Sequence, residues 1–275
     1  MNATPAAIRL PPTTGAGAVT QLRVAMSEWT KLRSLRSTVY TLLATAVVTL
    51  GFGILASAIT ASRWTSMTAD DKAGFNALST SLLGVNFGVL AIGVLGVLII
   101  TGEYSTGMVR STFAAVPKRL PVLWAKAGVY SLVALAVAVP STLIAFFVGQ
   151  ALLSSQHIQI AFSHSGVPVA VLGAALYLTL VGLLGLGLGA IVRNTAAGIA
   201  IFAAVMFVIP PLVSILPAAT ANAINPYLPS NAGAAIMKMG HQAHTLSPWV
   251  GLVVFAGYAA VSLAVAALLL VRRDV

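Results

Sequence analysis

The distribution of charged residues constrains this chain more than any other feature of its sequence. Asp, Glu, Lys and Arg make up only 7% of the 275 residues. They border five stretches without charge, which lie between Arg36 and Arg63, Lys72 and Glu103, Lys126 and Arg193, Arg193 and Lys238, and Lys238 and Arg272. A helix of about 20 apolar residues crosses a hydrocarbon core roughly 30 Å thick. Four stretches have room for one such helix and the third for two, so the pattern predicts an all-α polytopic membrane protein.

The overall composition excludes several other classes of protein. With 59% hydrophobic residues, a soluble domain would expose large apolar patches. The net charge of +10 does not indicate nucleic-acid binding, because the cations lie at the ends of apolar segments, where they orient a chain in a membrane. The chain has no cysteine, which excludes disulfides and thiolate metal sites.

We expect a disordered cytoplasmic tail at residues 1–20 and a single transmembrane domain at 21–275. The six predicted spans are 38–60, 80–101, 122–150, 167–192, 195–216 and 248–271. Glycine pairs such as Gly84 with Gly88, Gly93 with Gly96, and Gly185 with Gly189 allow close helix contact. They fit either packing within the chain or a dimer seam.

The positions of lysine and arginine predict the orientation. Eleven lie on the expected cytoplasmic side, namely Arg23, Lys31, Arg33, Arg36, Arg110, Lys118, Arg119, Lys126, Arg193, Arg272 and Arg273. Three lie on the other side, namely Arg63, Lys72 and Lys238. Because cytoplasmic loops carry the excess of cations, both termini are expected in the cytoplasm and the chain in the plasma membrane.

The segment Leu212–Met237 is apolar but contains Pro217, Pro226 and Pro229. Proline removes backbone donors, and unsatisfied backbone in lipid costs several kcal/mol per group. We therefore predict an outer re-entrant segment between spans 5 and 6, and we expect the Pro210-Pro211 pair to bend or end the fifth helix.

The segment Gln21–Arg36 is typical of an amphipathic helix that lies in the membrane interface. A helical wheel puts apolar side chains on one face, namely Leu22, Ala25, Met26, Trp29 and Leu32. Polar side chains, Lys31 among them, lie opposite, and Arg33 lies nearer the apolar side. The helix is either a passive topology anchor or a mechanical element.

The loop Gly102–Pro121 is the one long connection on the expected cytoplasmic side. It predicts a short helix from about Ser105 to Ala115, with Arg110 exposed and Met108, Val109 and Phe113 buried against a partner. So short a helix is unstable alone in water, so we expect membrane or another protein to hold it. The alternative is a plain connector.

The sequence offers no catalytic chemistry. It has no phosphate-binding Gly-x-x-x-x-Gly-Lys-Ser/Thr motif. The four histidines (His157, His164, His241 and His244) fall in expected outer loops without carboxylates nearby, so we predict no catalytic residue, metal or cofactor site in this chain. The predicted spans contain no Asp, Glu or His, which proton- and sodium-driven carriers use as relays. Energy for uphill transport would have to arrive from another subunit.

Three segments together resemble the bacterial type-2 ABC transporter permeases. They are SEWTKLRSLRST at Ser27–Thr38, GEYSTGMVRSTFAAVPKR at Gly102–Arg119 and NPYLPSNAG at Asn225–Gly233. The resemblance extends over about 21–273, and its most specific part is Glu103–Arg119. It implies six-span permeases that pair, either as a homodimer or with a similar chain, each binding a separate ATPase that holds ATP and Mg²⁺.

The resemblance also assigns roles to individual residues. It makes Gln21–Arg36 an elbow helix that includes Trp29, Lys31 and Arg33. It implies a coupling helix that docks on the ATPase through Glu103, Tyr104, Thr106, Gly107 and Arg110.

The function expected from the resemblance is ATP-driven export of a hydrophobic or amphiphilic compound such as a drug, peptide antibiotic or lipid. Asn86, Phe87, Met206 and Phe207, in the second and fifth predicted spans, are candidates for the wall of the path. The alternatives are a membrane scaffold or regulatory subunit that anchors an ATPase without transporting, and an ATPase-free channel.

Overall fold

The computed structural model describes residues 20–116, 118–239 and 244–272. The predicted tail therefore lies outside the described residues except for Thr20, as does His241. Within these ranges there is no strand, and six helical stretches are long and apolar enough to cross a membrane. The predicted all-α architecture is confirmed at this level. The stretches are Arg36–Ser66, Ala77–Ser105, Arg119–Gln156, Val167–Val192, Thr195–Val213 and Pro248–Arg272.

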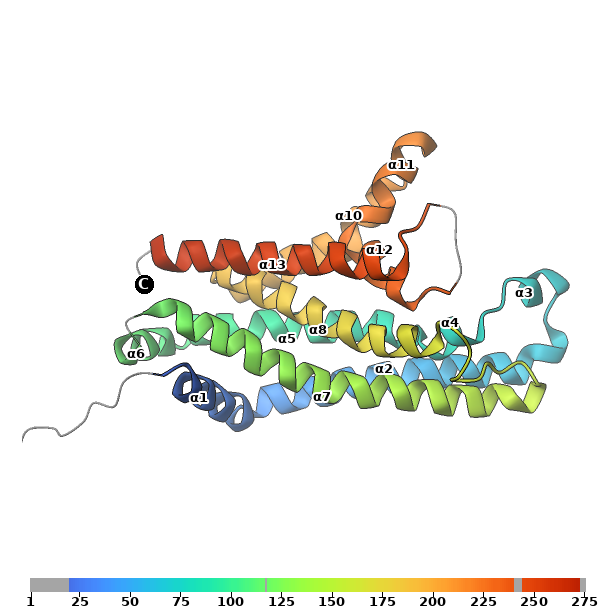
Figure 1. Ribbon diagram of the computed structural model, residues 1–275, viewed down its shortest axis with the longest axis horizontal. Coiled ribbons are helices and arrows are strands. Elements are labelled where there is room, and N and C mark those ends of the chain that lie inside the picture. Colours follow the sequence, from blue (N-terminus) through green and yellow to red (C-terminus); the bar gives the residue numbers. More distant parts are fainter. Residues whose placement is uncertain (1–19, 117, 240–243, 273–275) are drawn as a thin grey trace, which may run out of the picture.

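The long helices run side by side along one axis (Figure 1). They are α2 (Arg36–Arg63), α5 (Leu83–Ser105), α7 (Arg119–Leu153), α8 (Val167–Val192) and α13 (Pro248–Arg272). One end of the bundle carries α1 (Gln21–Ser34), α6 (Met108–Ala115) and the C-terminal end of α13. The opposite end carries the short α3 (Ala69–Ala73), and α4 (Ala77–Ser81) leads from it into α5.

Helices α5 and α8 form the centre of the bundle, and glycines let their backbones touch. A Cβ atom on Gly96 of α5 would collide with the carbonyl oxygen of Gly182 on α8. In the same way, a Cβ atom on Gly185 would collide with the carbonyl oxygen of Gly93. Small residues at a helix crossing favour such packing in membranes. These glycines therefore serve packing within the chain.

Helix α2 buries its polar side and exposes its apolar side. Thr45, Thr49 and Ser57 are buried, and the hydroxyl of Ser57 donates to the carbonyl oxygen of Gly53 at 2.9 Å. The exposed side carries large apolar side chains, namely Val39, Tyr40, Leu43, Val47, Phe52, Leu55 and Ile59. A helix surrounded by lipid is expected to show this arrangement, because hydrocarbon offers its hydroxyl groups no partner.

The fifth apolar stretch, Thr195–Val213, is irregular near the Pro210-Pro211 pair, where a bend or an end was expected. Helix α9 (Thr195–Ala203) continues as a π-helical turn, η3 (Ala204–Val208), and then as α10 (Ile209–Val213). Pro210 and Pro211 lie at the start of α10, where their missing N–H groups cost least. The stretch ends at Val213, three residues before the predicted end.

The segment after α10 contains only short helices. They are α11 (Ala218–Ile224), η4 (Asn225–Tyr227), α12 (Pro229–Ala234) and η5 (Ala235–Met237). Helices α10 and α11 project from the side of the bundle, whereas α12 lies against α13 (Figure 1). Gly251 of α13 permits that contact, because a Cβ atom there would collide with the carbonyl oxygen of Ala232.

Candidate functional site

Helix α1 packs against α7 through residues spaced four apart. Val24, Glu28 and Leu32 are buried. Of the predicted apolar face, Leu32 is buried against the bundle, whereas Leu22, Met26 and Trp29 are exposed. The buried face is built around a charged residue, Glu28, which a hydrophobic pattern does not select. At the end of α1, Leu35 adopts an extended conformation and turns the chain into α2.

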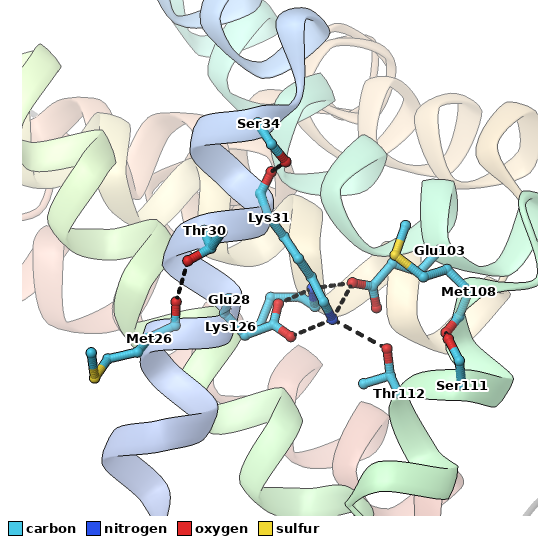
Figure 2. Close-up of polar contacts among 10 residues, drawn as sticks. All are labelled: Met26, Glu28, Thr30, Lys31, Ser34, Glu103, Met108, Ser111, Thr112 and Lys126. Carbon is cyan, nitrogen blue, oxygen red and sulfur yellow. Dashed lines mark hydrogen bonds and ion pairs between the residues drawn. The ribbon is translucent and has the colours of Figure 1, made fainter.

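Four charged side chains from three helices meet beneath α1 (Figure 2). We refer to Glu28 and Lys31 of α1, Glu103 of α5 and Lys126 of α7 as the charge cluster. Lys31 Nζ lies 2.7 Å from Glu28 Oε1 and 3.0 Å from Glu103 Oε1. Lys126 Nζ contacts Glu28 Oε2 and lies 2.9 Å from Glu103 Oε1. The cluster therefore ties α1, α5 and α7 together.

The charge cluster is almost closed to solvent, so each charged group depends on a partner of opposite charge within the cluster. Glu28, Glu103 and Lys126 are 1%, 7% and 3% exposed. Two carboxylates face two ammonium groups, so the formal charges cancel. A buried ion is tolerated only when paired and hydrogen-bonded, and loss of one partner leaves an uncompensated charge that costs about 3–5 kcal/mol.

Lys31 is the most accessible member of the charge cluster. Its burial alone would lower the pKa of the ammonium group, but hydrogen bonds to Glu28 and Glu103 and the negative charge of both outweigh that effect. The pKa of Lys31 is therefore raised above its ordinary value of 10.5. The helical wheel places Lys31 opposite the apolar face, and the structure shows that its ammonium group turns inward to these carboxylates.

The loop after α5 forms a separate helix that begins later than predicted. Helix α5 continues to Ser105, and Gly107 then takes a left-handed conformation with φ of 72°. Such a φ favours glycine, and it separates the axes of the two helices. Helix α6 consequently starts at Met108 and not at Ser105. The hydroxyl of Thr112 on α6 accepts a hydrogen bond from Lys31 Nζ at 3.2 Å, which joins α6 to the charge cluster.

Helix α6 is held by its own chain. Val109 is buried, and Phe113 packs against the core and against the small cluster of Val24, Val122 and Ala125. Val109 is thus buried without an external partner, whereas Met108 and Phe113 are half-buried within the chain. Residues Thr106, Gly107, Arg110, Ser111, Ala114 and Ala115 remain exposed. Helix α6 therefore presents a preformed surface of small and polar residues and one cation.

Two arginines join the same region to the end of α13. Arg193 ends α8 in a left-handed conformation, lies 5.3 Å from the ring of Tyr104 and donates to the carbonyl oxygen of Leu269. Arg119 lies 5.6 Å from the ring of Phe113 and donates to the carbonyl oxygen of Leu270 at 3.2 Å. Cations stabilise the C-terminal end of a helix, where carbonyl groups lack partners. Tyr104 thus lies inside a set of contacts that reaches α13.

The four candidate path residues divide into exposed and buried positions. Asn86, Phe87 and Phe207 are exposed, and the ring of Phe87 stacks on that of Phe52 with centroids 4.0 Å apart. Met206 is 1% exposed and lies within the core of the chain. Met206, in the π-helical turn, therefore does not reach an exposed face of the chain.

Sequence reasoning selected Lys31 and Glu103 but missed Glu28 and Lys126. One signal was present, because the sequence has only five acidic residues against fifteen basic ones. An acidic residue so rare in an apolar chain is expected to have a basic partner. Lys126 also follows the uncharged Leu120–Ala125, so its predicted span begins with an ionisable group that needs one.

The described residues contain no group of three His, Cys, Asp or Glu side chains that could hold a metal ion. A comparison of the sequence with models of known protein families and with curated proteins finds no match.

Proposed function

We propose that this chain is the membrane-spanning subunit of an ATP-driven exporter, similar to the type-2 ABC permeases. In this proposal α6 docks on a separate ATPase subunit that binds ATP and Mg²⁺, and α1 is the elbow helix on the inner leaflet. The exported compound is hydrophobic or amphiphilic, because the exposed candidates for the path wall include Phe87 and Phe207. The chain itself carries out no reaction.

A single observation carries the proposal, namely that α6 is joined to the charge cluster that ties α1, α5 and α7 together. Thr112 of α6 shares Lys31 with Glu28 of α1 and Glu103 of α5. A displacement of α6 must therefore move α1 with it, or break the hydrogen bond between Lys31 and Thr112 and the packing of Phe113. A coupling element needs such a link, because force from a partner reaches the spans only through contacts that differ between two states.

The exposed positions support a path formed with a second permease. Asn86 and Phe87 lie on an exposed face of α5, beside Phe52 of α2. We propose that two copies, or this chain and a similar one, meet so that these residues and Phe207 face the path. The short helices within Leu212–Met237 form its outer cap as a re-entrant segment. The excess of basic residues at the α1 and α6 end supports a cytoplasmic location for that end.

The proposal is tested by purifying the full-length chain from its native membrane in a mild detergent. We expect an ATP-hydrolysing subunit to co-purify in a fixed ratio, and its hydrolysis to rise when the exported compound is added. A single cysteine at Arg110 gives a specific cross-linking probe, because the natural sequence contains no cysteine. This R110C variant should cross-link to the ATPase, whereas a cysteine at Arg63 should not.

The same experiment distinguishes the alternative functions. A scaffold would retain and cross-link the ATPase but would not move any compound when reconstituted into vesicles. A channel without an ATPase would give no such complex and would conduct its solute down a gradient without ATP. Either result would overturn the exporter assignment.

A further inference from the structure

A cavity of about 330 Å³ lies beside the charge cluster, between α1, the start of α2 and the end of α5. Binding sites for small molecules commonly measure roughly 300–1,000 Å³, so this one is large enough for a small amphiphile. Its walls are mostly apolar and include Leu32, Leu95, Leu98 and Ile99. One end is formed by the charge cluster, so the cavity has an apolar part and a charged part.

Two nearly buried oxygen-bearing groups in this cavity lack partners. Both lysines of the charge cluster contact Glu103 through Oε1, and Glu103 Oε2 makes no hydrogen bond in the described part of the chain. The hydroxyl of Thr38, a residue that is 4% exposed, likewise has no hydrogen bond to any described residue. Both residues line the cavity, so these two oxygens are available to a ligand that donates hydrogen bonds.

The accessible polar atoms of the cavity favour a head group that donates hydrogen bonds over an anion. Lys31 already donates to Glu28, Glu103 and Thr112, which uses its three N–H groups. Lys126 is 3% exposed and lies against the same two carboxylates. The accessible acceptor is consequently an oxygen of a carboxylate, and a hydrogen bond from an ammonium group to a carboxylate is about twice as strong as a neutral one.

We propose that this cavity binds an amphiphile with a primary ammonium head and an apolar tail. The head donates to Glu103 Oε2 and to the hydroxyl of Thr38, and the tail lies against Leu95 and Leu98. Such a head occurs both on an aminated membrane lipid and on a soluble amphiphilic amine. The inference goes beyond the proposed function, because binding here requires neither an ATPase nor transport.

The test uses the full-length chain in nanodiscs of phosphatidylcholine, whose head group has no N–H. Binding of radiolabelled dodecylammonium is measured by equilibrium dialysis and corrected with empty nanodiscs. We expect one molecule per chain and at least tenfold weaker binding of dodecyltrimethylammonium and of dodecyl sulfate, which have the same tail. Equal binding of the sulfate and the ammonium compound would overturn the proposal.

Three variants locate the site. Leu98→Trp fills the cavity and should weaken dodecylammonium binding at least tenfold, as should Glu103→Gln. Thr38→Val removes only the hydroxyl and should weaken it severalfold without disturbing the charge cluster. The matched control is Leu43→Trp, on the exposed side of α2, which should bind as the natural chain does. If Leu98→Trp and Leu43→Trp bind equally well, the assignment of the cavity is wrong.

A second measurement separates the two sources of the ligand. Nanodiscs containing equal phosphatidylethanolamine and phosphatidylcholine are dissolved, and lipids retained by the purified chain are counted by mass spectrometry. Selective retention of phosphatidylethanolamine that is lost in Leu98→Trp identifies a membrane lipid. Dodecylammonium binding without such retention identifies a soluble amine, and absence of both overturns the proposal. A chain that fails these tests yet cross-links an ATPase through R110C refutes the cavity and not the proposed function.

Discussion

Glu28 of α1 and Lys126 of α7 form an ion pair between two almost fully buried side chains. The two residues are 98 positions apart in the sequence. Because Glu103 and Lys31 complete the charge cluster, four residues hold α1, α5 and α7 in one arrangement. Removal of a single member leaves a buried charge without a partner. Substitutions in the cluster should therefore destabilise the end of the bundle that carries α1 and α6.

Replacement of Lys126 by methionine should destabilise the protein strongly. The two carboxylates would keep only Lys31, and the buried excess of negative charge should lower the free energy of unfolding by about 3–5 kcal/mol. Unfolding of the detergent-solubilised chain can be followed by tryptophan fluorescence. Lys118→Met, at an exposed lysine near the same end, is the control and should change little. The double variant Glu28→Gln with Lys126→Met should recover part of the loss, and a purely additive effect would contradict the pairing.

The stability contributed by Lys31 should depend on pH. The pKa of Lys31 is raised in the folded protein, so protonation favours folding. This contribution is fully present below 10.5 and should be lost as the pH rises through the higher pKa of the folded state. Thermal unfolding of the natural chain and of Lys31→Met, measured from pH 7 upward, should therefore converge in strongly alkaline solution. A difference that stays constant with pH would refute this account.

Replacement of Arg110 by alanine should weaken the ATPase contact without affecting the fold. Arg110 is exposed and has no ion pair among the described residues, so its loss should change the free energy of unfolding by less than about 0.5 kcal/mol. An arginine at the centre of an interface often contributes more than 1.4 kcal/mol, which corresponds to an affinity change of tenfold or more. Affinity of the purified subunits measures this, with Arg63→Ala as the control. Unchanged affinity in Arg110→Ala would count against α6 as the docking element.

Replacement of Gly96 by alanine should disrupt the centre of the bundle. The new methyl group would meet the backbone carbonyl of Gly182, so α5 and α8 would have to move apart. We expect a loss of more than about 2 kcal/mol of stability, seen as a poor yield of monodisperse protein. Gly51→Ala is the matched control, since a Cβ atom there meets no atom within 4 Å. Normal behaviour of Gly96→Ala would show that the helices are not in contact at this point.

Single cysteines should reveal on which side of the membrane each end lies. The natural chain has none, so each variant carries one reactive thiol. Cysteines at Arg23 and Arg110 should react with a membrane-impermeant maleimide only after the cells are opened. A cysteine at Lys72, near the opposite end, should react in intact cells. Labelling of all three positions in intact cells would contradict the orientation predicted from the basic residues.

Six apolar helices could be predicted from the sequence alone, because uncharged stretches long enough to cross a bilayer are visible in it directly. The sequence also predicts a break between the second span, ending at 101, and a short helix from about Ser105, although the break falls at Gly107. Local pattern was insufficient for α1, where the hydrophobic face suggested by Trp29 and Met26 is exposed. A periodicity of apolar residues cannot indicate that Glu28 lies on the packing face.

Which charged side chains form ion pairs could not be predicted from the sequence, because it depends on how the helices pack. The sequence predicts that Lys126 is a cation at a membrane boundary. Its burial is possible only because Glu28 and Glu103 approach it from two other helices. An ion pair in an apolar environment depends on distances of about 3 Å between groups on separate elements. No local pattern encodes such distances, because they result from how α1, α5 and α7 pack together.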